Sequence, residues 1–303
     1  MLASGTRALL DRYAIASRAL ARVGGDRSAV EAGQSVEFHD FRPYQPGDEL
    51  RYVDWRVYAR TGRLYTRLYQ AERAVELHLV LDNSASMGLG GKFDHARTVV
   101  RLLSYVAQRD APTQVHLLFG GATPRLRGRG GMLETWRFID EAPLATGGAA
   151  GSRGPLTGLV PFAMGLPSAR GRSLVIVVSD LLEDASIEPG LAALRSRGVD
   201  VGFLQALSRD ELDPPPGLLE LHDVESGEKL PVGPDEALTY RDEVRDHVRR
   251  TREAILRAGY RHQLLTAPTV GADPAAALGT SGTSSAERTA LTELIKLGLL
   301  VKR

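Results

Sequence analysis

Apolar runs and helix-like segments alternate along the chain from residue 75 onward. The runs have the length of strands, and the segments between them carry apolar residues every three or four positions, as helices packed on one face do. Two runs, 75–82 and 172–180, are apolar at nearly every position, which is typical of strands buried on both faces of a sheet. The pattern predicts an α/β fold with a doubly wound, mostly parallel sheet. We expect its strands at 75–82, 113–120, 172–180, 199–207 and 260–267, and helices at 93–109, 131–142, 186–198 and 237–259.

The segments on either side of this region predict smaller elements. Residues 6–23 have helical spacing, residues 61–70 alternate like a strand, and Ser226-Gly227 is typical of a hairpin turn. Small and polar residues at 267–285 indicate a flexible linker before a final amphipathic helix. We therefore expect three parts: an N-terminal helix and small β extension at 1–74, the α/β domain at 75–266, and a linker with a C-terminal helix at 267–303.

Charge and composition exclude several classes of protein. The 303 residues carry a net charge of +1, which gives no general attraction to nucleic acid or acidic lipid. The chain has no cysteine, so disulfides, thiolate metal sites and cysteine nucleophiles are excluded. No stretch approaches the roughly 20 apolar residues of a membrane helix, and the charged N-terminus is unlike a secretory signal. We expect a cytoplasmic protein without a transmembrane segment.

Polar side chains follow both of the most apolar strands. Asp82, Ser84 and Ser86 come after the first strand, and Asp180 comes after the second. The carboxyl ends of parallel strands meet at one edge of a sheet, where doubly wound folds place their ligands. Phosphate binding, nucleophilic catalysis and metal binding are the three chemistries that such a turn can serve.

Two of these chemistries lack residues that they need. A phosphate-binding P-loop requires Gly-x-x-x-x-Gly-Lys-Ser/Thr, but Ser86 stands at the first glycine position and Phe93 at the magnesium-binding hydroxyl. The nucleophile motif Gly-x-Ser-x-Gly is absent, and no histidine lies in an obvious loop at the end of another strand to activate Ser84. We therefore expect no catalytic residue and no organic cofactor.

A divalent cation suits the turn better. The Asp-x-Ser-x-Ser pattern supplies oxygen donors, which magnesium prefers. Ser84 and Ser86 can bind the ion directly and Asp82 can bind it through water, while Asp180 brings a second negative charge. In the alternative, these side chains cap the next helix, but that helix is predicted to begin only near Phe93. We therefore predict a site for magnesium, manganese or calcium.

Two stretches of the chain resemble known families. The run Asp82-Asn83-Ser84-Ala85-Ser86 resembles the metal-ion-dependent adhesion site of von Willebrand factor A domains, whose signature is Asp-x-Ser-x-Ser, a distal threonine and a distal aspartate. Ser179-Asp180 matches the distal aspartate. Residues 37–73 resemble the hallmark of the domain-of-unknown-function-58 family. The matching parts are Glu37-Phe38, Arg42-Pro43-Tyr44-Gln45-Pro46-Gly47-Asp48, Arg51-Tyr52-Val53-Asp54-Trp55, Ala59-Arg60-Thr61 and Glu72.

The resemblance implies a bacterial protein with a von Willebrand A-like domain. Such a protein acts with a MoxR-type AAA+ ATPase, in a chaperone-like role, to assemble or activate a client complex. Three hydroxyls are candidates for the distal threonine position, namely Thr146, Ser152 and Thr157. Gly151-Ser152 matches the usual Gly-Thr step, whereas Thr157 lies at the better distance from Asp180. None of the three is followed by the usual aspartate, and the membrane helices of many relatives are missing.

The hallmark region at 37–73 has two interpretations. In the structural one, an ion-pair network clamps the segment to the sheet while Trp55 and the tyrosines are buried. In the functional one, the same residues form a surface that binds a partner. The charged residues concerned are Arg42, Arg51, Asp54, Arg56, Arg60 and Glu72.

Three functional hypotheses follow. The first is a metal-dependent protein-interaction module, in which an Asp or Glu of the client protein completes the coordination of the cation. The second is a metal-dependent hydrolase that activates water at the same site. The third is a scaffold with a vestigial metal site, whose contacts are made by the long helix at 237–259 or the C-terminal helix.

Overall fold

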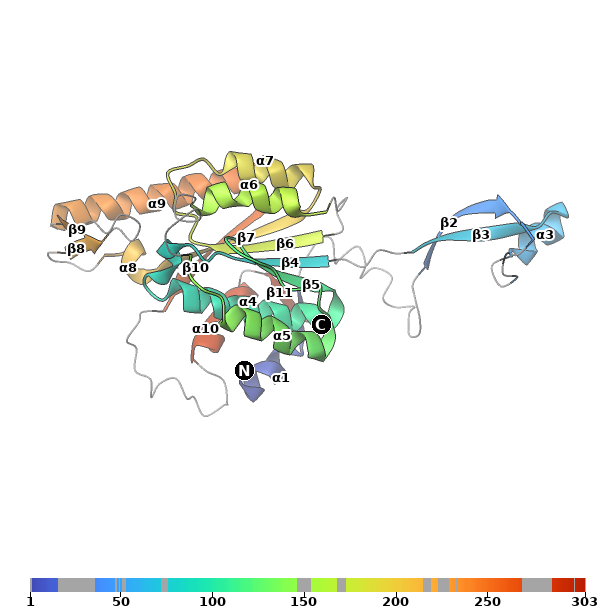
Figure 1. Cartoon of the computed structure of the whole chain (residues 1–303), viewed down its shortest axis with the longest axis horizontal. Coiled ribbons are helices and arrows are strands. Elements are labelled where there is room, and N and C mark those ends of the chain that lie inside the picture. The colour runs from blue at the N-terminus through green and yellow to red at the C-terminus, as the bar shows by residue number, and fades with distance from the viewer. Residues whose placement is uncertain are drawn as a thin grey trace. The chain divides into compact units, whose positions relative to one another are not determined.

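The chain forms two compact units in the computed structural model (Figure 1). One unit comprises residues 1–22 and 75–303, and the other comprises 23–74. This division differs from the expected one, because both terminal helices belong to the α/β unit. The structure describes residues 2–15, 36–46, 48, 50, 53–71, 76–145, 154–167, 173–214, 219–222, 229–232, 234–268, 285–296 and 298–302.

Five parallel strands form the central sheet, as predicted. β4 pairs with β5 on one side and with β6 on the other, β6 pairs with β7, and β7 pairs with β10. Nearly every residue of β6 and β7 is buried, because helices cover both faces of the sheet. The strands are β4 (Glu76–Leu81), β5 (Thr113–Leu117), β6 (Ser173–Ser179), β7 (Asp200–Ser208) and β10 (Arg261–Ala267).

The order of the strands reverses direction at one point in the sheet. Across the sheet the order is β10-β7-β6-β4-β5, so the chain runs from β4 to β5 and then crosses back past β4 to β6. Doubly wound folds bind ligands outside the carboxyl ends of the two strands where this reversal occurs. Asp82 directly follows β4 and Asp180 directly follows β6. The topology therefore places both aspartates at the favoured position.

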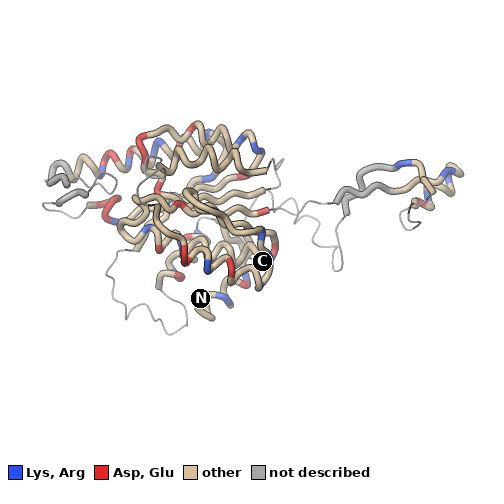
Figure 2. Tube along the Cα trace, in the orientation of Figure 1, with Lys and Arg blue, Asp and Glu red and all other residues tan. Residues whose placement is uncertain are grey.

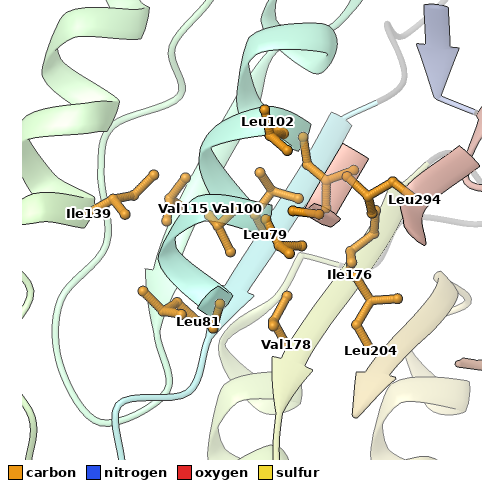
Figure 3. Packing of buried hydrophobic residues seen from close by; sticks show 14 of the residues in the cluster. Leu79, Leu81, Val100, Leu102, Val115, Ile139, Ile176, Val178, Leu204 and Leu294 are labelled. Atoms are coloured by element: carbon orange, nitrogen blue, oxygen red, sulfur yellow. The ribbon is translucent and has the colours of Figure 1, made fainter. Parts of the chain in front are cut away.

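Four helices cover one face of the sheet (Figure 1). Figure 3 shows Leu79 of β4, Ile176 of β6 and Leu204 of β7 in one apolar layer with Val100 of α4 and Leu294 of α10. All five side chains are almost completely buried. The covering helices are α1 (Ser4–Leu10), α4 (Lys92–Asp110), α5 (Gly128–Asp140) and α10 (Ser285–Lys296).

Three further helices, α6 (Pro155–Gly165), α7 (Glu188–Ser196) and α9 (Pro234–Arg257), cover the opposite face. Val177 and Phe203 point from the strands into this second layer, where they join residues of the helices. Acidic and basic residues are mixed along the helices (Figure 2). This mixing agrees with the small net charge and gives no single-sign field over these elements.

The two ends of the α/β unit pair with each other. β1 (Tyr13–Ile15) is antiparallel to β11 (Leu300–Lys302), so the helices predicted at 6–23 and 286–303 are wrong at these residues. Such three-residue strands are too short for apolar periodicity to distinguish them from helix. The rest of the first prediction, 16–23, lies outside the described residues, and so does nearly all of the linker predicted at 267–285.

The smaller unit is a hairpin that carries a short helix. β2 (Val36–Pro43) pairs antiparallel with β3 (Tyr65–Ala71), which confirms the strand predicted at 61–70, and α3 (Trp55–Thr61) lies between them in the chain. The side chain of Trp55 is 56% exposed, so this unit does not itself bury the residue as the structural interpretation expected.

The described residues show part of the expected ion-pair network of the smaller unit. The Asp54 carboxylate caps α3 by accepting hydrogen bonds from the backbone N–H groups of Arg56 and Val57, at 2.8 and 3.1 Å. Arg42 forms its ion pair with Asp48, which the network did not include. Two expected members, Arg51 and Glu72, lie outside the described residues.

The remaining elements are short. A 3₁₀ turn, η3 (Ala85–Gly88), follows β4, and α8 (Arg209–Leu212) follows β7. β8 (Leu219–His222) and β9 (Lys229–Val232) form the predicted antiparallel hairpin. Among the helices that the structure describes, none has the length and apolar character needed to cross a lipid bilayer.

Candidate metal centre

The ends of β4 and β6 bring the two predicted acidic residues close together. The backbone N–H of Asp82 donates to the carbonyl oxygen of Val178 at 2.9 Å, which continues the pairing of the two strands by one residue. Asp82 and Asp180 are both completely buried. Two carboxylates are therefore held in the interior at the carboxyl edge of the sheet.

Asp82 is fixed by hydrogen bonds through both of its oxygens. Oδ1 accepts from the backbone N–H of Ser84 at 2.8 Å, and Oδ2 accepts from the hydroxyl of Ser179 at 2.5 Å. Burial, and next the negative charge of Asp180, raise the pKa of Asp82 to about 7. A nearby cation would favour the ionised form of Asp82 and so relieve this cost.

Ser84 and Ser86 lie at the start of the 3₁₀ turn with their hydroxyls adjacent. The two Oγ atoms are 3.1 Å apart, so both can face one small ion. Neither hydroxyl caps a helix: no side chain caps η3, and α4 begins at Lys92 with Gly91 as an N-cap without a side-chain bond. The capping interpretation is therefore excluded for both serines.

Asp180 is held by a lysine that is itself completely buried. The ammonium group of Lys92 donates to Oδ2 of Asp180 at 2.9 Å and to Oε1 of Glu211 at 2.6 Å. The other oxygen of Asp180, Oδ1, accepts from the backbone N–H of Leu182 at 3.2 Å. Burial alone would lower the pKa of Lys92, but the charges of Asp180 and Glu211 outweigh it and raise that pKa. Lys92 is thus a charged ammonium group beside the predicted ion site.

The backbone after Asp180 is strained. Leu181 has a φ angle of 54°, in the left-handed region that a leucine rarely adopts, and its side chain is buried. The amide of Gln205 on the neighbouring strand donates to the carbonyl oxygen of Asp180 at 2.8 Å. The ring of His247 on α9 contacts the carbonyl oxygen of Leu181 at 2.8 Å. Neighbouring elements therefore hold the chain in a conformation that it would otherwise avoid.

The predicted third hydroxyl is less well defined. Thr157 is exposed at the start of α6, and its Oγ1 donates to the carbonyl oxygen of Gly154 at 2.9 Å and to Oε1 of Glu183 at 3.1 Å. Over the described part of the chain, no hydrogen bond joins Thr157 to the Asp82–Ser86 turn. Thr146 and Ser152 lie outside the described residues.

The chemical types of these residues suit a hard cation. The cluster offers two adjacent hydroxyls and two buried carboxylates, and the oxygen atoms of such groups suit magnesium or manganese. The described residues contain no group of three or more His, Cys, Asp or Glu side chains that could hold a metal. A site built mainly from serine hydroxyls does not need such a group. Lys92 counts against the fit, because it already occupies an oxygen of Asp180.

The geometry also bears on the phosphate interpretation. A P-loop lysine must reach the phosphates of a bound nucleotide, but the ammonium group of Lys92 is buried between two carboxylates. Its position agrees with the expectation that the Gly91-Lys92 turn is not a P-loop.

Sequence reasoning missed two residues of the cluster, Lys92 and Glu211. Glu211 belongs to a capping box, Ser208-x-x-Glu211, in which the Ser208 hydroxyl accepts from the N–H of Glu211 at 3.1 Å and the carboxylate accepts from the N–H of Ser208 at 2.7 Å. This pattern directly after a strand signals a helix start at the carboxyl edge of the sheet. This capping-box pattern is the sequence feature from which the position of Glu211 near the site could have been predicted.

A comparison with family models decides the family. The model described as "Protein of unknown function DUF58" matches residues 40–254. The chain belongs to the DUF58 family. The match covers most of the hairpin formed by β2 and β3, the whole site and most of α9, which confirms the resemblance to this family found from the sequence.

Curated relatives of this DUF58 chain come from mycobacteria. "Uncharacterized protein Rv1480" of Mycobacterium tuberculosis and "Uncharacterized protein Mb1516" of Mycobacterium bovis are each 31% identical over 214 residues. The aligned region is 67% of this chain and 65% of each relative.

The solved structures that match this chain are more distant in sequence. An aerotolerance-related membrane protein from Bacteroides fragilis is 16% identical with a TM-score of 0.42, and the match covers 74% of this chain and all of that one. BatB from Bacteroides thetaiotaomicron is 13% identical with a TM-score of 0.41, over 74% of this chain and 98% of that one.

Proposed function

We propose that this DUF58 chain is a protein-interaction module that depends on a divalent cation. Ser84 and Ser86 bind the ion directly, and Asp82 and Asp180 neutralise it from nearby. A third hydroxyl, from Ser152 or Thr157 with Thr146 as a further candidate, completes the protein ligands. One position stays open for an Asp or Glu of a client protein. Magnesium is the expected ion, and manganese and calcium suit the same donors.

One observation carries this proposal. At the point where the strand order reverses, two buried carboxylates and two adjacent hydroxyls gather at the carboxyl ends of β4 and β6. Two buried acids that repel each other are costly without a compensating positive charge, and the raised pKa of Asp82 reflects burial together with the charge of Asp180. A bound divalent ion is a direct physical solution.

The proposed partner is a MoxR-type AAA+ ATPase. Support for it comes from membership of the DUF58 family and from the resemblance of the site to von Willebrand A domains. Together the two proteins would assemble or activate a client complex. The chain binds the client or the ATPase in a cation-dependent way, and ATP hydrolysis by the ATPase supplies the energy for assembly or activation.

Metal binding is tested first. Mn²⁺ is titrated into the wild-type chain, and binding is followed by calorimetry and by the thermal unfolding midpoint. At about 100 times its dissociation constant, the ion should stabilise the chain by about 2.7 kcal/mol. Ser84→Ala and Asp82→Ala should lose this effect, whereas Ser196→Ala, which alters an exposed hydroxyl on α7, should keep it. A wild-type chain without any Mn²⁺-linked shift would refute the metal dependence.

Partner binding is tested next. The MoxR-type ATPase is mixed with the wild-type chain and with Ser84→Ala, in the presence of Mg²⁺ or of a chelator. Capture should require both Mg²⁺ and Ser84. Equal capture under all conditions would leave an interaction module that does not use the metal.

A further inference from the structure

The feature that the proposed function leaves unexplained is the burial of Lys92. Its side chain is completely buried, which is unusual for a lysine, and it lies between Asp180 and Glu211. Removing an ammonium group from water is costly unless good partners surround it. Two carboxylate contacts, at 2.9 and 2.6 Å, meet that requirement.

Lys92 offsets part of the negative charge of the cluster. Asp82 and Asp180 are buried side by side, and Glu211 lies on the other side of the lysine. The ammonium group is the one cation that contacts Asp180 among the residues that the structure describes. The lysine therefore supplies at this aspartate the positive charge that a metal ion would otherwise bring.

The same contact opposes metal binding. A divalent ion near Ser84 and Ser86 would be repelled by an ammonium group held on Asp180, and it would compete with that group for the carboxylate. Glu211 gives Lys92 a second partner. Because the lysine contacts Oε1 of Glu211 while Oε2 receives the N–H of Ser208, the Lys92–Glu211 pair does not depend on Asp180.

We propose that Lys92 is a built-in competitor of the divalent cation. Its ammonium group neutralises Asp180 when no metal is bound, and Glu211 retains the lysine when Asp180 turns to the metal. The affinity for metal then depends on how strongly the ammonium group of Lys92 interacts with Asp180 relative to Glu211. Glu211 is a positioning residue in this scheme, because it acts on the ion only through Lys92. This inference rests on the proposed metal site.

The test uses two substitutions with opposite expected effects. Lys92→Met removes the competing charge and should tighten Mn²⁺ binding by about tenfold or more. Glu211→Gln leaves Lys92 entirely to Asp180 and should weaken Mn²⁺ binding several-fold, while glutamine still suits the third position of the capping box. Lys92→Arg keeps the positive charge and should stay close to wild type. Affinities are measured by calorimetry, and circular dichroism confirms that each variant is folded.

The outcomes separate this inference from the proposed function. If the wild-type chain binds no Mn²⁺ but Lys92→Met does, the role of Lys92 as a competitor of the cation is supported. The proposed metal dependence of the wild-type chain is then refuted. If Lys92→Met binds no more tightly than wild type, or Glu211→Gln binds more tightly, the competitor is refuted while the metal site stands. If no variant binds Mn²⁺, both are refuted. Should Lys92→Met fail to fold, the direction of the Glu211→Gln effect decides.

Discussion

The hydroxyl of Ser179 donates to Oδ2 of Asp82 at 2.5 Å, which joins the ends of two adjacent strands by a buried side-chain hydrogen bond. The same Oγ accepts from the backbone N–H of Leu181 at 3.0 Å. One serine thus connects the first acidic residue of the site to the strained residue that follows the second. Removal of the Ser179 hydroxyl should therefore affect both Asp82 and the backbone at Leu181.

Ser179→Ala should destabilise the chain by about 1–3 kcal/mol, because it leaves a buried carboxylate oxygen without this donor. The hydrogen bond from Ser179 lowers the pKa of Asp82, so the substitution should raise that pKa further. Urea unfolding measures the first effect, and carboxyl NMR titration measures the second. Ser173→Ala, at the buried opposite end of β6, is the matched control. Equal losses in the two variants would contradict a special role for the Ser179 bond.

His78 and His116 predict a loss of stability in acid. They lie on adjacent strands with His78 Nδ1 and His116 Nε2 3.1 Å apart, and burial lowers the pKa of each ring to about 4. The unfolded chain takes up these protons near pH 6.5, whereas the folded chain resists until about pH 4. Their contribution to stability is therefore complete above pH 6.5 and is lost as the pH falls toward 4, by up to about 3 kcal/mol for one ring.

The variant His78→Gln/His116→Gln tests this assignment, because glutamine cannot be protonated. Its free energy of unfolding should fall less steeply than that of wild type between pH 6.5 and 4.5. Chemical denaturation at a series of pH values gives both slopes. Parallel curves would show that other groups cause the acid sensitivity.

The two tryptophans should respond very differently to truncation. Trp136 on α5 is 9% exposed and its indole N–H contacts the hydroxyl of Ser104 at 3.3 Å, so Trp136→Ala should cost about 3–5 kcal/mol. Trp55 on α3 is 56% exposed, so Trp55→Ala should change the free energy of unfolding by no more than about 0.5 kcal/mol. Thermal and urea unfolding compare them directly. A large loss in Trp55→Ala would restore the interpretation in which this residue is buried.

Glu183 should stabilise the first turn of α6. Its Oε2 accepts from the backbone N–H groups of Leu156 and Thr157, at 2.6 and 3.1 Å, although it lies far along the chain from that helix. Glu183→Ala should cost about 0.5–2 kcal/mol, as the loss of a helix cap does, and Glu183→Gln should cost less. Because Glu183 also holds Thr157, a drop in Mn²⁺ affinity in Glu183→Ala would favour Thr157 over Ser152 as the third hydroxyl.

The sequence predicted the sheet well because its strands carry strong local signals. The runs that become β4 and β6 are mostly apolar, and the acidic and hydroxyl residues at and directly after their ends identified the carboxyl edge. That Asp82 and Asp180 lie together follows from the rule that doubly wound folds place ligands at the reversal of strand order.

Other features depend on contacts between distant segments and could not be predicted in this way. Lys92 and Glu211 are in contact because α4 and α8 begin at the same edge of the sheet. No local sequence pattern indicates that these two helix starts lie close together. β1 and β11 are strands of three residues, which is too short for a recognisable sequence pattern. They become strands because they pair with each other. The exposure of Trp55 depends on how α3 packs, whereas composition treats tryptophan as a buried residue.

The pairing of β1 with β11 has a consequence for biosynthesis. Tyr13 of β1 pairs with Lys302 of β11, at a very large separation along the sequence. During translation the segment with β1 leaves the ribosome well before β11 is made, so the two strands cannot pair until β11 has been synthesised. Contacts of such large sequence separation also form slowly. The pairing of β1 with β11 is therefore expected to be a late step in the folding of the α/β unit.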